Sequence, residues 1–597
     1  MDTPAMHRPS TAGSDPDLTA LAWDLEQHLG PWADPSGIVT IAAAMRDDEQ
    51  ERYPYLAVNH LHRWGLHEYC LPRAHGGRAG DVEVGFTLMR LVARRDPTAA
   101  IALMLTNLAF MPVWIAGTQE QKDHYTARIN RGSVFAWGLS EAQHGSDVLA
   151  NDTTAVKVDG GWEITGGKDY IGNATVADVL MVQAQTSERR GPAGTSIFAI
   201  DRRAASAGSV IQGPRYRLHG IRAKDLSSFR LDRMFVPEDA LIGGEGQGLE
   251  IALKGAQVAR ATITSVSLSV VDTALRSAIG FAAERHLFGG RVLDVPYTRR
   301  QLLGVFADLL VGEATCTASV RGLQANPDQI SVTSSASKFL VPCTMTKSLD
   351  EIAMVLGARG YIRDDVEYGH LGKAMRDNLV AIFADGNTVV NLRVIASQLG
   401  SLLARGAREE PNAEESQRLK AVFDFSAEMP QWRPEEHALS SRTGDDAVTF
   451  LGVAVDQLRA RAEHAGDPEC QQRLRLAVEL AERFVEETDR LRTRYAELSQ
   501  VHGRQLGSSA DLLELAESFI TLHGVACLIH FYAWSWDQLD SRLHDGAVLC
   551  AALARAWRLF DSRSEGLPAE VDNAAVDVMV SLHDDKLLFS LRPLRVL

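Results

Sequence analysis

The stretch from Phe135 to Asn173, FAWGLSEAQHGSDVLANDTTAVKVDGGWEITGGKDYIGN, decides how the rest of this chain is interpreted. It contains short alternating segments separated by turns rich in Gly, Ser and Thr. Val156 and Val158 alternate with polar neighbours and are followed by Asp159-Gly160-Gly161, a strong turn signal, after which the alternation resumes. Residues 153–178 therefore predict a β-hairpin.

A tight polar turn, Ser140 to Asp147, precedes this hairpin. Its small residues let backbone N–H groups approach a ligand closely, as phosphates or an electron-rich ring would require. The turn and the hairpin together indicate one wall of a cofactor site.

Several segments resemble motifs of the acyl-CoA dehydrogenase family of flavoproteins. In that family a Thr-Glu-Pro-x-x-Gly-Ser-Asp turn and a Lys-x-Trp-Ile-Thr-Asn strand cover one side of the FAD isoalloxazine. Here the corresponding residues are Ser140-Glu141-Ala142 with Gly145-Ser146-Asp147, and Lys168-Asp169-Tyr170-Ile171-Gly172-Asn173. The resemblance spans roughly residues 50 to 400. It includes further motifs in the expected order, at residues 71–77, 117–122, 235–237, 246–248, 284–289, 357–361 and 376–377.

The composition indicates a folded, multidomain protein. A chain of 597 residues is too long for one ordinary core, and 45% hydrophobic residues can fill several. Six scattered cysteines without CxxC spacing favour reduced thiols over disulfides or a zinc site. The net charge of −16 argues against nucleic-acid binding. Apolar runs such as Ile101–Leu105 are short and no signal-peptide pattern opens the chain, so we expect a cytoplasmic protein with no metal and no membrane partner.

Changes in hydrophobic period divide the chain. Helical spacing gives way to short alternating segments near residue 134 and returns near residue 246, and the charged, Pro-containing segment 405–417 indicates a boundary. We expect a flexible tail at 1–16, an N-terminal helical domain at 17–133, a middle β-domain at 134–245, a second helical domain at 246–404, a linker at 405–417 and a C-terminal helical extension at 418–597.

The resemblance implies the fold class: α+β, mostly α, with an N-terminal helical domain, a middle β-barrel-like domain and a C-terminal helical bundle. The additional helical domain is similar to that of acyl-CoA oxidases and the larger bacterial dehydrogenases. Within it, His523 and His530 belong to an aromatic-rich helical stripe and are expected to pack in a core rather than bind metal.

The chemistry that the resemblance implies is the α,β-dehydrogenation of an acyl thioester, in which a carboxylate removes the α-proton while the β-hydride passes to flavin N5. The family base is normally a Glu before a Gly, after an Arg-Asp pair. Here Arg376-Asp377 is followed by Ala384-Asp385-Gly386, and this segment contains no Glu. The alignment on Gly386 makes Asp385 the catalytic base.

Three alternatives to this assignment stay open. If Asn387-Thr388-Val389 is matched to the Asn-Thr-Val of acyl-CoA oxidases, the base position becomes Ala384, and the other family location for a base is Ala259. Neither residue can accept a proton. Asp385 could instead cap the following helix.

The resemblance also assigns cofactor and substrate contacts. The FAD-binding residues are expected to be Leu139, Ser140, Gly145, Ser146, Tyr170, Gly172, Arg285, Phe288, Gly357, Ala358, Gly360, Asn387 and Thr388. Tyr170 replaces the usual Trp, and Gly172 replaces a Thr whose hydroxyl bonds the ring. Arg285 matches an Arg that meets the FAD of a neighbouring subunit. Arg222 and Ser227 fall where the family lines its thioester channel, so they are predicted to bind substrate.

Four functional hypotheses remain. The first is a dehydrogenase acting on acyl-CoA or acyl-carrier-protein, with electron-transfer flavoprotein as acceptor. The second is an acyl-CoA oxidase that reduces O2 to H2O2. The third is a different flavin oxidase or monooxygenase chemistry, such as nitroalkane oxidation, whose base is an Asp. The fourth is a non-catalytic DNA-binding branch. A homo-oligomer is expected, and a dimer is favoured because the extension could block a second interface.

Overall fold

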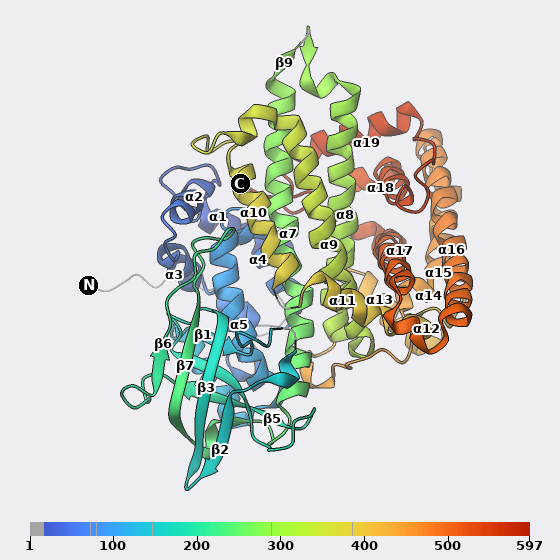
Figure 1. Ribbon diagram of the computed structural model, residues 1–597. Helices are drawn as coiled ribbons and strands as arrows, with labels where there is room; N and C mark the ends of the chain where they lie inside the picture. The colour runs from blue at the N-terminus through green and yellow to red at the C-terminus, as the bar shows by residue number, and fades with distance from the viewer. Residues whose placement is uncertain (1–16, 72, 79, 146, 288, 385) are drawn as a thin grey trace.

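The computed structural model describes residues 17–597 except Pro72, Ala79, Ser146, Phe288 and Asp385. The predicted tail at 1–16 thus lies outside the described residues. Helices form the N-terminal part of the chain (Figure 1). They are α1 (Leu18–Leu29), α2 (Ile41–Glu49), α3 (Tyr55–Trp64), α4 (Val82–Ala93), α5 (Pro97–Ala116) and α6 (Gln119–Asn130). Both α4 and α5 begin at an Asp, Asp81 or Asp96, whose carboxylate accepts a backbone N–H of the first turn.

Among the described residues, the strands between 135 and 242 form one eight-stranded sheet. They are β1 (Phe135–Gly138), β2 (Thr154–Val158), β3 (Gly161–Gly172), β4 (Val179–Gln185), β5 (Thr195–Asp201), β6 (Val210–Gln212), β7 (Leu226–Pro237) and β8 (Leu241–Ile242). Their order is β6-β7-β3-β2-β4-β5-β8, with β1 parallel to β4. The predicted hairpin is confirmed, because β2 and β3 are antiparallel with Val158 opposite Gly161. Gly160 takes a φ of 73°, which glycine adopts without strain.

A bundle of long helices lies above the sheet in Figure 1. It contains α7 (Gly248–Glu284), α8 (Pro296–Ala325), α9 (Ile330–Leu356) and α10 (His370–Phe383), followed by the shorter α11 (Thr388–Ala396) and α12 (Leu399–Leu402). The strands β9 (His286–Leu287) and β10 (Gly290–Arg291) connect α7 to α8 at the end of the bundle far from the sheet. At 1.5 Å per residue α7 is about 55 Å long.

The C-terminal extension packs on the side of this bundle (Figure 1). It contains α13 (Ala413–Phe423), α14 (Asp446–Thr449), α15 (Leu451–His464), α16 (Pro468–His502), α17 (Ala510–Trp534), α18 (Ala547–Trp557) and α19 (Ala569–Asp584). One apolar core joins Phe306 of α8 with Phe519 of α17 and Leu549 of α18. The helix α13 begins inside the segment predicted as a linker, because Asn412 and Glu415 form a capping box there.

The last residues of the chain return to the N-terminal helices. Leu588, Leu594 and Val596 join the apolar core of α1 and α4. Nearby, the buried Glu313 of α8 accepts hydrogen bonds from Arg90 at 2.7 Å and from the backbone N–H of Leu591 at 2.8 Å. The end of the chain therefore contacts both the N-terminal helices and α8 of the bundle.

Among the described residues, four helices are long and apolar enough to cross a membrane by length and composition alone: α5, α7, α8 and α17. In each, 72–89% of the most apolar stretch is buried inside the protein. Polar residues interrupt the apolar stretches of these helices, so unbroken apolar runs such as Ile101–Leu105 do not reveal them. The arrangement of helices, β-domain, bundle and extension confirms the predicted fold class.

Candidate active site

One wall of the candidate site forms where the chain after β1 lies beside β3. The backbone N–H of Asp169 donates to the carbonyl oxygen of Ser140 over 3.1 Å. The fully buried Lys168 ammonium donates to Leu139 O at 3.4 Å and to Glu141 Oε1 at 2.9 Å. Burial lowers the pKa of Lys168 to about 8, although the charge of Glu141 opposes this shift. The predicted cofactor residues Leu139 and Ser140 are therefore fixed against β3.

Two residues of β3 that are predicted to contact FAD, Tyr170 and Gly172, differ in how much free space surrounds them. The Tyr170 side chain is 56% exposed, and its ring stacks on Tyr216 with 5.5 Å between centroids. Its φ of 62° is rare for an aromatic residue, and such strain is concentrated at functional sites. At Gly172, by contrast, a Cβ would lie 2.6 Å from Leu105 Cδ1 and 3.3 Å from Lys224 Cε. A threonine at that position could not fit unless these side chains moved.

The loop between α10 and α11 is held against two neighbouring helices. Gly386 has a φ of 92°, and a Cβ there would lie 3.3 Å from Arg260 Nη2 of α7. The buried Lys338 of α9 donates to Gly386 O over 3.1 Å. The predicted base, Asp385, lies outside the described residues, but the loop that carries it is next to Arg260.

Asn387 and Thr388, predicted as cofactor contacts, begin α11. The Asn387 side chain accepts the backbone N–H of Val390 at 3.0 Å and is the N-cap of this helix. The N-cap of α11 is thus Asn387, and the alternative in which Asp385 caps the helix rests on a side chain that lies outside the described residues.

An apolar cavity of about 80 Å³ lies between α4, α5 and α7. Its walls include Phe86 and Met89 of α4, Met104 and Met111 of α5, Val258, Ala259 and Thr262 of α7, and Trp432 of the extension. Ala259 directly precedes Arg260 in α7. The cavity and the loop of Gly386 therefore adjoin the same turn of this helix.

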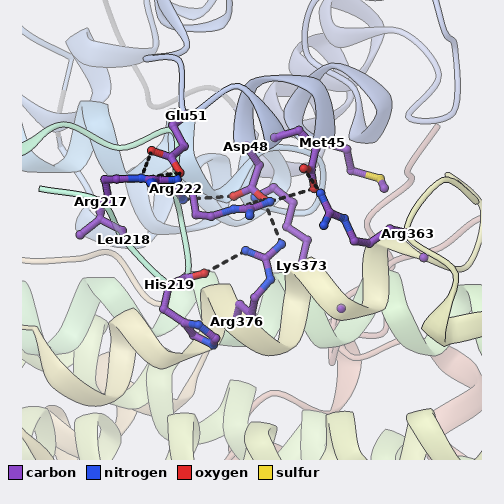
Figure 2. Close-up of a pocket in the computed structure, with 13 residues that line it drawn as sticks. Met45, Asp48, Glu51, Arg217, Leu218, His219, Arg222, Arg363, Lys373 and Arg376 are labelled. Carbon is purple, nitrogen blue, oxygen red and sulfur yellow. Dashed lines mark hydrogen bonds and ion pairs between the residues drawn. The ribbon is translucent and has the colours of Figure 1, made fainter.

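A larger, polar cavity of about 530 Å³ lies where α2, the loop before β7 and α10 meet (Figure 2). Its centre is Asp48, which is 1% exposed and accepts hydrogen bonds from Arg222 at 2.7 Å and Arg376 at 2.9 Å. Burial favours the neutral acid, but Lys373 and these two arginines together lower the pKa of Asp48. Because this cavity is lined by paired charges, the smaller apolar cavity is better suited to an acyl chain.

The two residues predicted to bind substrate are separated in the structure. Arg222 lines the polar cavity, where it is ion-paired with Asp48 and, at 2.8 Å, with Glu49. Ser227 is fully buried, and its hydroxyl lies 2.9 Å from the carbonyl oxygen of Gly213. The Ser227 hydroxyl therefore supports the β6–β7 connection, and neither side chain lines the apolar cavity.

Other predicted cofactor residues lie at the opposite end of the bundle. Arg285 follows α7, whereas Gly357, Ala358 and Gly360 follow α9 (Figure 1). The sheet contacts α7 near Gly255, where a Cβ would lie 2.9 Å from the Trp137 ring. From there to Arg285 the helix extends about 45 Å. Leu139 and Arg285 are thus too far apart to serve one cofactor within a single chain.

Arg285 and Gly357 are also at ordinary helix ends. Each is the C-cap of its helix, and Gly357 has a φ of 56°. Phe288 and Ser146, also predicted to contact FAD, lie outside the described residues.

A group of potential metal ligands occurs in the turn that contains Gly145. Ligand atoms of Glu141, His144 and Asp152 lie within 4.8 Å of one another. Glu141 is already paired with Lys168, and Asp152 with Arg190 at 2.6 Å. Because both carboxylates are neutralised by cations, the group is a poor metal site, while Gly145 itself is exposed with open space above its Cα.

The sequence reasoning missed two buried lysines at the site, Lys224 and Lys338. They are 7% and 0% exposed. Lysine is rarely buried without a partner, so a single Lys within the otherwise uncharged stretch 331–346 was the available signal for Lys338. No comparable signal marks Lys224, which lies in a charged loop.

The sequence models of three domains of one family match this chain. They describe the acyl-CoA dehydrogenase N-terminal domain at residues 38–133, the middle domain at 136–234 and the C-terminal domain at 246–400. Together they cover more than half of the chain, so the protein belongs to the acyl-CoA dehydrogenase family. As a member, it is an FAD-dependent oxidoreductase.

Individual relatives agree with this placement. A short-chain specific acyl-CoA dehydrogenase of Clostridium acetobutylicum is 32% identical over 251 residues, which are 41% of this chain and 65% of the relative. Butyryl-CoA dehydrogenase from Megasphaera elsdenii superposes with a TM-score of 0.59 at 22% identity, covering 65% of this chain and 100% of that one. The prolyl acyl carrier protein oxidase AnaB gives 0.58 at 21% identity, with coverage of 65% and 100%. These two structures share the fold.

The residues at the β3 wall fit a flavin. The exposed ring of Tyr170 offers a flat apolar face, and the open space above Gly145 admits a close approach to the backbone. At Gly172, Leu105 and Lys224 occupy the space that a Cβ would need. These residues are compatible with the FAD of the family, and their individual contacts to it stay predictions.

Proposed function

We propose that this protein catalyses the α,β-dehydrogenation of an acyl thioester. The observation that carries the proposal is the apolar cavity of α4, α5 and α7, which adjoins the turn of α7 that contacts the loop of Gly386. An acyl chain in this cavity would direct its thioester end toward that loop. When bound, FAD supplies the hydride acceptor. The chain's own residues then provide the acyl pocket and the base.

Asp385 is the proposed base. It precedes Gly386, whose Cα lies beside the Arg260 guanidinium, and a nearby cation favours an ionised carboxylate. Lys338 and Asn391 both donate to Gly386 O, at 3.1 and 3.0 Å, and hold the loop in place. Asp is one methylene shorter than Glu, and a misplacement of about 1 Å can cost on the order of 100-fold in rate. We therefore expect the position of the loop to make up for the shorter side chain of Asp385.

The cavity favours a short or compact acyl group. Its volume is about 80 Å³, and three methionines, Met89, Met104 and Met111, contribute to its walls. Methionine is flexible and fills irregular gaps, so the pocket can adapt to branched or cyclic groups of similar size. We therefore expect short acyl thioesters to be better substrates than long-chain ones.

Anaerobic titration of the FAD-loaded protein with a panel of acyl-CoA and acyl-carrier-protein thioesters tests this function. A short acyl thioester is expected to bleach the flavin absorbance and to yield the α,β-unsaturated product. If no thioester bleaches a stoichiometrically bound flavin, the proposed reaction is contradicted.

An oxidase acting on a carrier-protein thioester is the second candidate. It is favoured by the Asn387-Thr388-Val389 segment, by the lost hydroxyl at Gly172 and by the structural similarity to a prolyl acyl carrier protein oxidase. Air admitted to the reduced protein distinguishes the two. Rapid reoxidation with one H2O2 per turnover supports the oxidase, whereas slow reoxidation that electron-transfer flavoprotein accelerates supports the dehydrogenase.

We further propose a homodimer in which the end of the bundle near Arg285 completes the cofactor site of the partner. Apolar side chains are exposed around this end: Met354 at 73%, Tyr361 at 92%, Ile362 at 53% and Leu287 at 42%. Clustered exposed apolar residues mark interaction surfaces.

Tyr361→Asp is expected to yield a monomer that loses FAD, which light scattering and the flavin-to-protein ratio measure. A dimeric variant with full FAD content would contradict this arrangement.

A further inference from the structure

The helix α17 carries a histidine and a cysteine one turn apart, next to a buried carboxylate of the extension. His523 Nδ1 lies 2.6 Å from Asp445 Oδ2, and Cys527 Sγ lies 3.5 Å from His523 Nε2. All three residues are at most 1% exposed. A thiol, an imidazole and a carboxylate in this order form the arrangement that activates cysteine nucleophiles.

The electrostatics of this group favour a charged imidazole. Burial alone would lower the pKa of His523, but attraction to Asp445 and Cys527 and hydrogen bonds to both raise it well above its ordinary value. Asp445 is fixed in place, because its other carboxylate oxygen accepts the backbone N–H of Ala447 at 3.1 Å and caps α14. The imidazole is therefore able to hold the proton of the thiol.

A small cavity of about 20 Å³ opens onto the three side chains. This is room for a molecule of about the size of water. Asn326 also lines it, is 6% exposed, and its Oδ1 has no hydrogen-bond partner among the residues that the structure describes. An unpaired buried oxygen of this kind is costly, so it points to a small guest with a hydrogen-bond donor. Arg418, which also lines the cavity, has a side chain that is 21% exposed.

We propose that Cys527 is a peroxide-reactive cysteine whose sulfur, once its proton has passed to His523 Nε2, is oxidised by small hydroperoxides to a sulfenic acid. The thiolate sulfur attacks one oxygen of H2O2, so that an S–O bond forms and the O–O bond breaks. The sulfur is oxidised by two electrons and the peroxide is reduced. The leaving hydroxide takes the proton from His523 Nε2 and becomes water, while Asp445 balances the imidazolium charge before that transfer. The three reacting side chains lie beyond residue 400, outside the ranges matched by the family, and the proposal does not depend on the proposed function.

Two other cysteines of the same chain serve as internal controls. Cys316 and Cys550 are also fully buried, and burial raises the pKa of their thiols to about 11 and about 12. The full-length, FAD-loaded protein is exposed to H2O2, denatured in dimedone and analysed by peptide mass spectrometry. Cys527 is expected to acquire the sulfenic acid label at least tenfold faster than either control. Equal labelling of the three cysteines would overturn the proposal.

A variant and a second oxidant distinguish activation of Cys527 by its neighbours from simple access of the oxidant to the thiol. Asp445→Asn keeps an oxygen to cap α14 but removes the charge that stabilises the imidazolium, so labelling of Cys527 is expected to slow at least tenfold. An unchanged rate in the folded variant would contradict the role of Asp445. If the variant does not fold, cumene hydroperoxide decides: it is too large for the cavity and should label Cys527 at least tenfold more slowly than H2O2. Equal labelling rates of Cys527 with both oxidants would contradict the proposal.

Discussion

Gly172 and Asp385 carry less side chain than the family usually has at these positions. At Gly172 the missing group is replaced by two neighbours, Leu105 and Lys224, which fill the space from other elements. At position 385 the carboxylate is retained, on a side chain that is one methylene shorter than that of Glu. The first departure removes a hydroxyl, and the second keeps a carboxylate that we propose as the proton acceptor.

Gly172→Thr is expected to destabilise the fold rather than restore the family contact. The new Cβ would lie 2.6 Å from Leu105 Cδ1, and overpacking of this kind costs about 1–3 kcal/mol. Urea unfolding of the protein measures the change. Gly466→Thr, at an exposed position with nothing within 4 Å, is the control and should cost much less. Rescue of Gly172→Thr by Leu105→Ala would confirm the cause, and an unchanged midpoint for Gly172→Thr would exclude it.

These two residues also show what the sequence could and could not predict. The hairpin and its turn depend on adjacent residues such as Asp159 and Gly160, so the local pattern predicted them. The side chains that fill the space at Gly172 come from 67 residues upstream and 52 downstream. The pairing of Arg222 with Asp48 is likewise set by tertiary packing, which the motif containing Arg222 did not indicate.

At the scale of elements, α7 organises the site. Its first turns contact the sheet, its middle adjoins the apolar cavity and the loop of Gly386, and its far end carries Arg285. The extension reaches the same cavity through Trp432, whose ring lies edge-on to Trp114 of α5 at 4.4 Å. The extension therefore contributes to the acyl pocket that we propose.

Trp432→Ala is expected to shift substrate preference toward longer acyl chains. Removal of the indole enlarges the cavity, and one methylene in an apolar pocket changes kcat/KM by about 10-fold or more. The ratio of kcat/KM for two acyl-CoA substrates that differ by two methylenes measures the effect. Trp534→Ala, in α17 and away from the cavity lining, should leave the ratio unchanged. An unaltered ratio in Trp432→Ala would show that this cavity does not hold the acyl chain.

At the scale of the whole molecule, the chain forms one connected body. The C-terminal residues pack beside α1, so the backbone N–H of Leu597 donates to Glu26 Oε2 at 2.8 Å. Contacts over such sequence separations leave no local pattern, which is why the sequence predicted an added helical domain but not its attachment. The cytoplasmic location and the lack of nucleic-acid binding stay predictions.

The stability of this body should fall in mild acid because several histidines are buried. Burial lowers the pKa of His67 to about 3 and of His370, His437 and His530 to about 4, from the ordinary 6.5. Between pH 6.5 and 4 the unfolded chain binds more protons, so the free energy of unfolding decreases as the pH falls, by up to about 1.4 kcal/mol per pH unit for each histidine.

His530→Gln tests this pH dependence. The glutamine N–H can replace the hydrogen bond to Ala447 O, now 3.0 Å, but cannot take up a proton. Urea midpoints measured from pH 7 to pH 4.5 should show a smaller slope for this variant than for the wild type. His464→Gln, at an exposed position, should retain the full slope. If His530→Gln has the wild-type slope, that histidine does not contribute to the acid sensitivity.

The most direct test of the central claim is the rate of anaerobic flavin bleaching by a short acyl thioester in the wild type and in Asp385→Asn. The variant removes only the proton acceptor, so the account predicts a loss of at least 100-fold with FAD still bound. Asp159→Asn, in the exposed turn between β2 and β3, is the matched control and should bleach at the wild-type rate. Equal rates in the wild type and Asp385→Asn would contradict the assignment of the base and, with it, the proposed mechanism.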